Sequence, residues 1–216
     1  VGKNMVTAIR FWAKCFQMID ENQKPTPIAK NLLSDGGWDP YLEDEGSLWL
    51  LHYLLVSGGL SSTFNIVFNE LIKERPEITP DYYLSHINQR KEGNYNQNTL
   101  KKDFTVFYRT YYADFKASDI EESFTGVLTE LDLVKRVKKP SLGPDGKMKN
   151  HEVWVLSREV RRSIPREILL YSILTQHPND VSISFDQLYS GENEPGSLFA
   201  YSKEGLAAAL EDIAKT

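Results

Sequence analysis

The chain has 216 residues, of which 41 % are hydrophobic and 25 % are charged, so it can bury the core of one large or two small domains and is not intrinsically disordered. The single cysteine, Cys15, excludes an intrachain disulfide framework and is predicted to be a buried structural thiol. No apolar run approaches about 18 residues. We therefore predict no membrane span and a reducing, cytoplasmic setting.

The charge of the chain is unevenly distributed. The net charge is −5, yet residues 135–166 contain ten cationic side chains and three carboxylates, a local charge of +7 that leaves −12 for the remainder. A basic stripe on an acidic protein can bind one anionic partner while the rest of the surface repels it. The ten cations are Lys135, Arg136, Lys138, Lys139, Lys147, Lys149, Arg158, Arg161, Arg162 and Arg166.

A helix is predicted over residues 3–19, and its spacing separates two faces. The apolar face comprises Met5, Ile9, Trp12, Ala13 and Phe16. The polar face comprises Lys3, Asn4, Thr7, Arg10 and Lys14. This polar face has no carboxylate, and the free N–H groups of a first helical turn suit a phosphate. An ordinary solvated face explains the pattern equally well. A phosphate-binding loop is excluded because Lys3 is followed by Asn4.

The segment "GGWDPYLEDEGSLWLLHYLL" (36–55) concentrates carboxylates before an apolar helix. Asp39, Glu43 and Asp44 could hold Mg²⁺, since converging carboxylates are typical of phosphodiester-cleaving sites. Alternatively, Asp44 or Ser47 caps the helix that follows. In that interpretation, which we favour, Trp38, Tyr41 and Leu42 pack the loop on the core.

The remaining pattern is mainly helical. Two strands, residues 133–139 and 151–157, are predicted to form a hairpin across "PSLGPDGKMKN", where Pro144, Asp145 and Gly146 supply the turn. The expected fold class is mainly α, with winged-helix-like helical units and a small β-hairpin wing. Further helices are predicted near 26–34, 46–57, 62–74, 80–90, 97–115, 118–132, 157–162, 165–176, 184–190 and 202–214.

The order helix, hairpin, helix within residues 120–165 is that of the second half of a winged helix. Partial copies of this topology are predicted at residues 3–34 and after residue 165. We expect a domain at 1–115 that begins with a truncated unit, and a domain at 116–216 with the basic wing and a C-terminal three-helix segment. Because the first copy lacks its opening helices and the last lacks its wing, we expect the chain to be a fragment at both ends.

A wing of this kind lies along the phosphate backbone of a DNA duplex, where lysine and arginine bind without sequence preference. The helix at 118–132 carries carboxylates that would repel phosphate, so the wing and the first helix are the better candidates. Many winged helices bind proteins instead, and this alternative stays open. The predicted DNA-binding residues are Lys3, Asn4, Thr7, Arg10, Lys14, Lys135, Arg136, Lys138, Lys139, Lys147, Lys149, Arg158, Arg161 and Arg162. Catalytic residues cannot be assigned from the pattern, and His52 is predicted to be a hydrogen-bonded core residue.

Three segments, "VGKNMVTAIRFWAK", "DPYLEDEGSLWLLHYLL" and "SSTFNIVFNE", resemble in order a bacterial family of domains of unknown function. This family accompanies DNA phosphorothioation genes and is carried by SspB-type proteins. Its motifs match Gly2–Met5, Asp39–Asp44 and Leu48–His52; the resemblance is specific over residues 1–75 and general beyond.

The resemblance implies a DNA-binding component of a phosphorothioation or antiphage-defence system that works with other subunits of that system. It further implies nicking of one DNA strand, with Mg²⁺ as the cofactor. The alternative is a non-catalytic DNA-binding or protein-scaffolding module of the same system.

Overall fold

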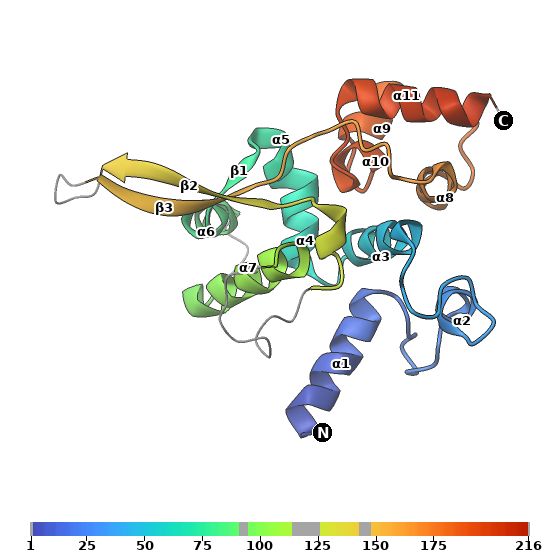
Figure 1. The fold of residues 1–216 in the computed structure, drawn as a ribbon, viewed down its shortest axis with the longest axis horizontal. Helices are drawn as coiled ribbons and strands as arrows, with labels where there is room; N and C mark the ends of the chain where they lie inside the picture. The colour runs from blue at the N-terminus through green and yellow to red at the C-terminus, as the bar shows by residue number, and fades with distance from the viewer. Residues whose placement is uncertain (1, 91–94, 114–125, 143–147, 216) are drawn as a thin grey trace. The chain divides into compact units, whose positions relative to one another are not determined.

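The computed structural model describes residues 2–90, 95–113, 126–142 and 148–215, with residues 141, 142 and 149 described by their main chain alone. These residues are mainly helical and contain one three-stranded antiparallel sheet (Figure 1), which confirms the predicted mainly α class with a small hairpin. The chain divides into two compact units: unit 1 is Val1–Asn69 with Glu159–Thr216, and unit 2 is Glu70–Arg158. The domain boundary between residues 115 and 116 stays a prediction.

The described part of unit 1 is helical, and the first turns of four of its helices are capped by the side chains of Thr26, Asp44, Ser184 and Ser202. Short capped helices suit the many Ser, Thr and Asp residues that precede apolar runs. The helices are α1 (Lys3–Cys15), α2 (Pro27–Leu33), α3 (Glu45–Ser57), α4 (Ser62–Ile66), α8 (Arg166–Gln176), α9 (Phe185–Ser190), α10 (Pro195–Leu198) and α11 (Lys203–Ala214).

The central element of unit 1 is α3, which is buried from Gly46 to Val56. A helix that is apolar on all sides must be covered on all sides, and α4, α8 and α10 pack against it. In the described part of the chain, no single helix has the length and apolarity to span a membrane. Among the described helices, only α3 taken together with Ser62–Glu74 is long and apolar enough, and this pair is bent by 97°.

His52 lies within α3 and is completely buried. Its Nε2 is 2.7 Å from the Leu198 carbonyl oxygen, to which it donates, and the rings of Trp49, Phe68 and Phe199 surround it. Burial lowers the pKa of His52 to about 4, because the charged form would lose its hydration. The prediction of a hydrogen-bonded core histidine is confirmed.

The apolar stripe of α1 is buried at its C-terminal end alone. Trp12 packs against Phe64 with ring centroids 6.0 Å apart, and Cys15 is buried, which raises its pKa to about 11 and confirms the predicted structural thiol. Met5 and Ile9, by contrast, are 58 % and 59 % exposed. The apolar face is therefore exposed over the first two turns of the helix.

The described part of unit 2 contains helices and the sheet, whose strand order is β1-β3-β2. Its core is aromatic: Phe104 and Phe107 of α7 are fully buried, and Trp154 of β3 stacks on Tyr108 at 3.9 Å between ring centroids. A π-helical turn, η1 (Val67–Leu71), leads from α4 to α5 (Ile72–Glu74). The other elements are β1 (Glu77–Ile78), α6 (Pro80–Gln89), α7 (Gln97–Tyr111), η2 (Thr129–Leu131), β2 (Lys135–Leu142) and β3 (Met148–Val155).

The helix predicted at residues 157–162 does not form. The Glu159 N–H donates to the Ala200 carbonyl at 2.9 Å, and the Glu159 carbonyl accepts from Ser202 N–H at 2.7 Å, so pairing with a distant segment replaces helical bonds. Arg161 has a φ of 52°, which is outside the helical region. The helix predicted at 118–132 falls largely outside the described residues, and its described end is the 3₁₀ turn η2.

Candidate nucleic-acid interface

The β2–β3 hairpin extends beyond the third strand of its sheet. The two strands pair in antiparallel register from Lys135 opposite Val155 to Leu142 opposite Met148. β1 pairs with β3 at Trp154 and Val155, at the base of the hairpin, and the two longer strands continue outward from there (Figure 1). The predicted pairing of the two strands is confirmed, and the strands are longer at the turn end than predicted. The predicted turn residues Pro144, Asp145 and Gly146 lie outside the described residues.

Successive side chains of β2 point to opposite faces, so the cations at consecutive positions occupy both faces of the hairpin. Arg136 and Lys138 are at register positions opposite Trp154 and Glu152, on one face. The neighbouring positions Lys135 and Lys139 belong to the other face. Lys149 is opposite Ser141 in the register, with its side chain outside the description, and Lys147 lies outside the described residues.

Carboxylates of unit 2 already accompany several of these cations. Because such exposed pairs contribute only about 0–1 kcal/mol each, a phosphate can replace the carboxylate. These ion pairs nevertheless make the net positive charge of the hairpin smaller than the number of its cations suggests. The pairs are Lys135 with Asp132 (3.1 Å), Arg136 with Glu152 (3.4 Å) and Lys139 with Glu77.

Arg136 and Lys138 differ in how accessible their side chains are to a binding partner. The Arg136 side chain is 20 % exposed, and its guanidinium lies 5.1 Å from the centre of the Tyr112 ring. Lys138 is exposed on the same strand. Lys138 is thus the hairpin cation best placed for a phosphate, whereas Arg136 also holds the base of the hairpin together.

The polar face of α1 is a separate candidate surface in unit 1. Lys3, Asn4, Thr7 and Arg10 are exposed, and the first turn contains no acidic side chain. The Thr7 hydroxyl donates to the Lys3 carbonyl at 3.1 Å. Lys14 is less available, because its ammonium lies 2.9 Å from the Glu21 carboxylate.

The three arginines after the hairpin differ in exposure. The Arg161 side chain is only 7 % exposed, and its guanidinium is 3.4 Å from the Glu159 carboxylate. This burial argues against Arg161 as a phosphate contact. Arg162 is exposed and Arg158 is half-buried.

The acidic segment before α3 forms caps. The Asp39 carboxylate accepts from the N–H groups of Glu43 (3.0 Å) and Asp44 (2.9 Å), and the Asp44 carboxylate accepts from Gly46 N–H (2.7 Å). These bonds lower the pKa of Asp39, chiefly through the Asp44 N–H. Within the described ranges, no group of three or more His, Cys, Asp or Glu side chains is arranged to hold a metal ion.

Asp39, Glu43 and Asp44 therefore do not fit a magnesium ion, and their assignment as ligands stays a prediction that the geometry does not support. The Asp44 cap agrees with the favoured interpretation. The expectation that Trp38 and Tyr41 pack on the core is wrong, since they are 68 % and 84 % exposed.

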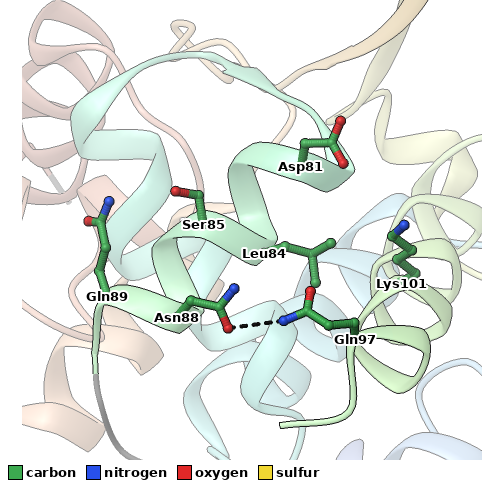
Figure 2. A pocket seen from close by; sticks show the side chains of 7 residues that line it. All are labelled: Asp81, Leu84, Ser85, Asn88, Gln89, Gln97 and Lys101. Atoms are coloured by element: carbon green, nitrogen blue, oxygen red, sulfur yellow. Dashed lines mark hydrogen bonds between the residues drawn. The ribbon is translucent and has the colours of Figure 1, made fainter. Parts of the chain in front are cut away.

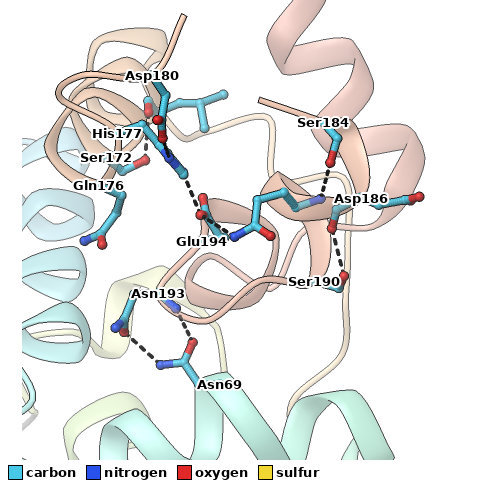
Figure 3. A network of polar contacts seen from close by, with 12 residues as sticks. Asn69, Ser172, Gln176, His177, Asp180, Ser184, Asp186, Ser190, Asn193 and Glu194 are labelled. Carbon is cyan, nitrogen blue, oxygen red and sulfur yellow. Dashed lines mark hydrogen bonds and ion pairs between the residues drawn. The ribbon is translucent and has the colours of Figure 1, made fainter. Parts of the chain in front are cut away.

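A polar network in unit 1 was not predicted from the sequence (Figure 3). His177 lies between two carboxylates, with Nδ1 2.7 Å from Asp180 and Nε2 2.7 Å from Glu194. The pKa of His177 is raised, first by the bond to Asp180 and then by Glu194, against the cost of desolvation. Glu194 is 2 % exposed, and Gln187 also donates to it at 3.1 Å.

The network continues to a neighbouring pair of amides. Asn193 N–H donates to the Asn69 side chain at 2.8 Å, and the Asn69 amide donates back at 2.9 Å (Figure 3). The local spacing His-x-x-Asp at residues 177–180 is the one signal in the sequence. The other partners come from distant segments that sequence spacing cannot bring together.

A hollow of about 490 Å³ lies between α6 and α7 in unit 2 (Figure 2). Leu84 is its apolar member, and the Gln97 side-chain amide donates to the side-chain oxygen of Asn88 at 3.2 Å on one side of the hollow. Because polar groups of the lining hydrogen-bond to each other, we assign no ligand to this hollow. The lining residues are Asp81, Leu84, Ser85, Asn88, Gln89, Gln97 and Lys101.

The fold and sequence are similar to those of SspB. A crystal structure of magnesium ion-bound SspB superimposes with a TM-score of 0.75, and another SspB crystal structure with 0.73, both at 26 % sequence identity. Each match covers 100 % of this chain and 66 % of the SspB chain, so the chain spans just under two thirds of the SspB length. No curated protein matches the sequence.

The resemblance to the SspB-type family is therefore confirmed in both sequence and structure. The model of the family described as "Protein of unknown function (DUF4007)" matches residues 1–216, and the chain belongs to that family.

Proposed function

We propose that this chain is a DNA-binding component of a bacterial phosphorothioation or defence system, and that the β2–β3 hairpin acts as its wing. The main observation that supports this proposal is the two-stranded β2–β3 ribbon, which extends beyond β1 and has cations on both faces. The likeness to SspB supports the choice of system. Other subunits of such a system are the proposed protein partners.

The chemistry of the hairpin favours the phosphate backbone over the base edges. Lysine and arginine release counterions from the duplex when they bind phosphates, which gives affinity without sequence preference. Phosphate oxygens would replace the carboxylates of Asp132, Glu77 and Glu152 as partners. Since the chain outside residues 135–166 carries −12, DNA is steered toward the hairpin and away from most of the remaining surface.

The first turns of α1 are a second proposed contact. Gly2 precedes the helix without a side-chain cap, so the first N–H groups and the positive end of the helix dipole are available to an anion. Lys3 and Arg10 add positive charge on the exposed polar face. This surface is proposed to contact DNA independently of the hairpin.

Nicking of one strand is the further activity that the family resemblance implies. Magnesium is present in one SspB structure, which supports it as a cofactor of that protein. We assign no residue of this chain to nicking, because Asp39, Glu43 and Asp44 do not fit the ion. A non-catalytic DNA-binding or scaffolding role in the same system is the alternative.

A salt series tests the DNA contact. The affinity for a fluorescently labelled duplex is measured between low and moderate salt for the native chain and for the variant Arg136→Gln/Lys138→Gln/Lys139→Gln. We expect the magnitude of the slope of log K against log[salt] to fall by about one for each lost phosphate contact.

The matched control removes the same charge from unit 1, with Lys24→Gln/Lys30→Gln/Lys215→Gln. It should leave the slope close to native. Equal slopes for the native chain and the hairpin variant would reject the wing. Plasmid nicking with and without Mg²⁺ separates the catalytic from the non-catalytic alternative.

A further inference from the structure

Trp38 and Tyr41 are more exposed than any other aromatic side chain among the described residues. Trp38 is 68 % exposed and Tyr41 is 84 % exposed, and both precede the buried helix α3. Large aromatic rings bury much area at low entropic cost, which makes them frequent anchors of protein interfaces. Their exposure therefore needs an explanation that the proposed DNA contact does not supply.

The main chain that presents these rings is held in place. Trp38 N–H donates to the Asn31 carbonyl at 2.7 Å, and Asp39 N–H donates to the Leu32 carbonyl at 3.0 Å. Asp39, between the two rings, accepts hydrogen bonds from the Glu43 and Asp44 N–H groups through its carboxylate, as described above. A side chain at Gly37 would come within 2.7 Å of the Leu32 carbonyl oxygen, so the tight approach requires glycine. A surface that is already ordered loses little entropy when it binds.

The residues next to the rings in the sequence are acidic. Residues 31–50 contain no lysine or arginine, and their five carboxylates give a local charge of −5. Four of the five are exposed, and Asp39 is half-buried. The carboxylates are Asp35, Asp39, Glu43, Asp44 and Glu45.

The exposed rings and the neighbouring carboxylates together indicate what kind of partner could bind here. The face of an aromatic ring attracts a cation, and a guanidinium can stack on the ring while donating to a neighbouring carboxylate. Nucleobases also stack on exposed aromatic rings, but a charge of −5 repels their phosphates. Charge complementarity thus favours a basic polypeptide over a nucleic acid.

We propose that residues 35–45, named here the aromatic turn, dock an arginine-bearing basic segment of a partner protein. Trp38 and Tyr41 stack with arginine side chains of that segment, and Glu43 and Glu45 pair with their guanidinium groups. The inference does not depend on the proposed DNA contact, since it rests on other residues and on charge of the opposite sign.

Titration with defined peptides tests the aromatic turn. A ten-residue peptide of alternating arginine and glycine is added to the full chain, and binding is measured by calorimetry and by fluorescence. We expect Trp38→Ala and Tyr41→Ala each to weaken binding about tenfold. A peptide with lysine in place of arginine should bind several-fold more weakly, because ammonium groups cannot stack in the same way.

The control variant Tyr95→Ala removes an aromatic ring that is 45 % exposed in unit 2 and should bind the peptide as the native chain does. Unchanged affinity in both Trp38→Ala and Tyr41→Ala would overturn the proposal. It would also be overturned if single-stranded oligothymidine bound in a Trp38-dependent manner. Self-association abolished by Trp38→Ala would equally overturn it, by identifying a second copy as the occupant.

Discussion

The aromatic core around His52 and the β2–β3 hairpin both contain groups that can carry positive charge, but their surroundings differ. His52 is enclosed by aromatic rings, and its hydrogen bond goes to a fixed main-chain carbonyl. The hairpin cations are at least partly in water and pair with carboxylates that phosphates can replace. The first arrangement contributes to stability and the second to binding, so substitutions in the two regions should separate these properties.

The largest effect is expected in the core of unit 1. Phe199 is fully buried and contacts the rings of Trp49, Tyr53 and Tyr201. Phe199→Ala should lower the free energy of unfolding by about 3–5 kcal/mol, through lost burial and the cavity left behind. Urea denaturation measures this change. A loss below about 1 kcal/mol would show that the core around α3 is less tightly packed than described.

A smaller effect is expected from the protonation of His52. Because the pKa is about 4 in the folded chain and 6.5 when unfolded, the unfolded chain takes up a proton first as pH falls. The contribution of neutral His52 is therefore complete above pH 6.5 and decreases toward pH 4, by about 3 kcal/mol in total.

The measurement compares urea unfolding of the native chain with that of His52→Gln between pH 7 and pH 4.5. The difference in unfolding free energy should shrink as pH falls. A difference that is independent of pH would contradict the burial of a neutral histidine.

His177 should show the opposite dependence on pH. Its pKa is raised by Asp180 and Glu194, so its contribution is complete below pH 6.5 and is lost as pH rises through the folded-state pKa. His177→Gln should cost about 1–2 kcal/mol at pH 6 and less at pH 9, since charged hydrogen bonds contribute that amount. Thermal unfolding at both pH values checks this, and an equal cost at the two values would count against a protonated His177.

The smallest effect on stability is expected in the hairpin. Lys138→Gln replaces an exposed cation and should change the free energy of unfolding by no more than about 0.5 kcal/mol, while it still weakens the binding of a duplex. Parallel urea and DNA titrations of the same preparation test this separation. A loss of unfolding free energy above about 1 kcal/mol would show that Lys138 stabilises the fold, contrary to this prediction.

Local patterns were sufficient for much of the fold. Continuous apolarity predicted α3 with His52 in the core, and the alternation of apolar and polar residues predicted the two strands of the hairpin. The helix at 157–162 was wrong because long-range pairing of Glu159 outweighs local propensity. The exposure of Met5 and Ile9 was not evident from the sequence, because amphipathic spacing does not reveal how far a covering surface extends.

The candidate site was less predictable than the fold. The cations of the hairpin are visible in the sequence, but their carboxylate partners become apparent only when strands and turns are placed in register. The network of His177 and Glu194 depends on segments brought together by folding. Exposure of Trp38 and Tyr41 could not be read from a motif that also suits packing against a core.

The central claim is that the β2–β3 hairpin contacts DNA. Acetylation of lysines, followed by mass spectrometry with and without a DNA duplex, tests it most directly. We predict that DNA slows the acetylation of Lys138 and Lys139. The acetylation rates of Lys30 and Lys203 in unit 1 should not change. Equal modification rates of the hairpin lysines with and without DNA would contradict it.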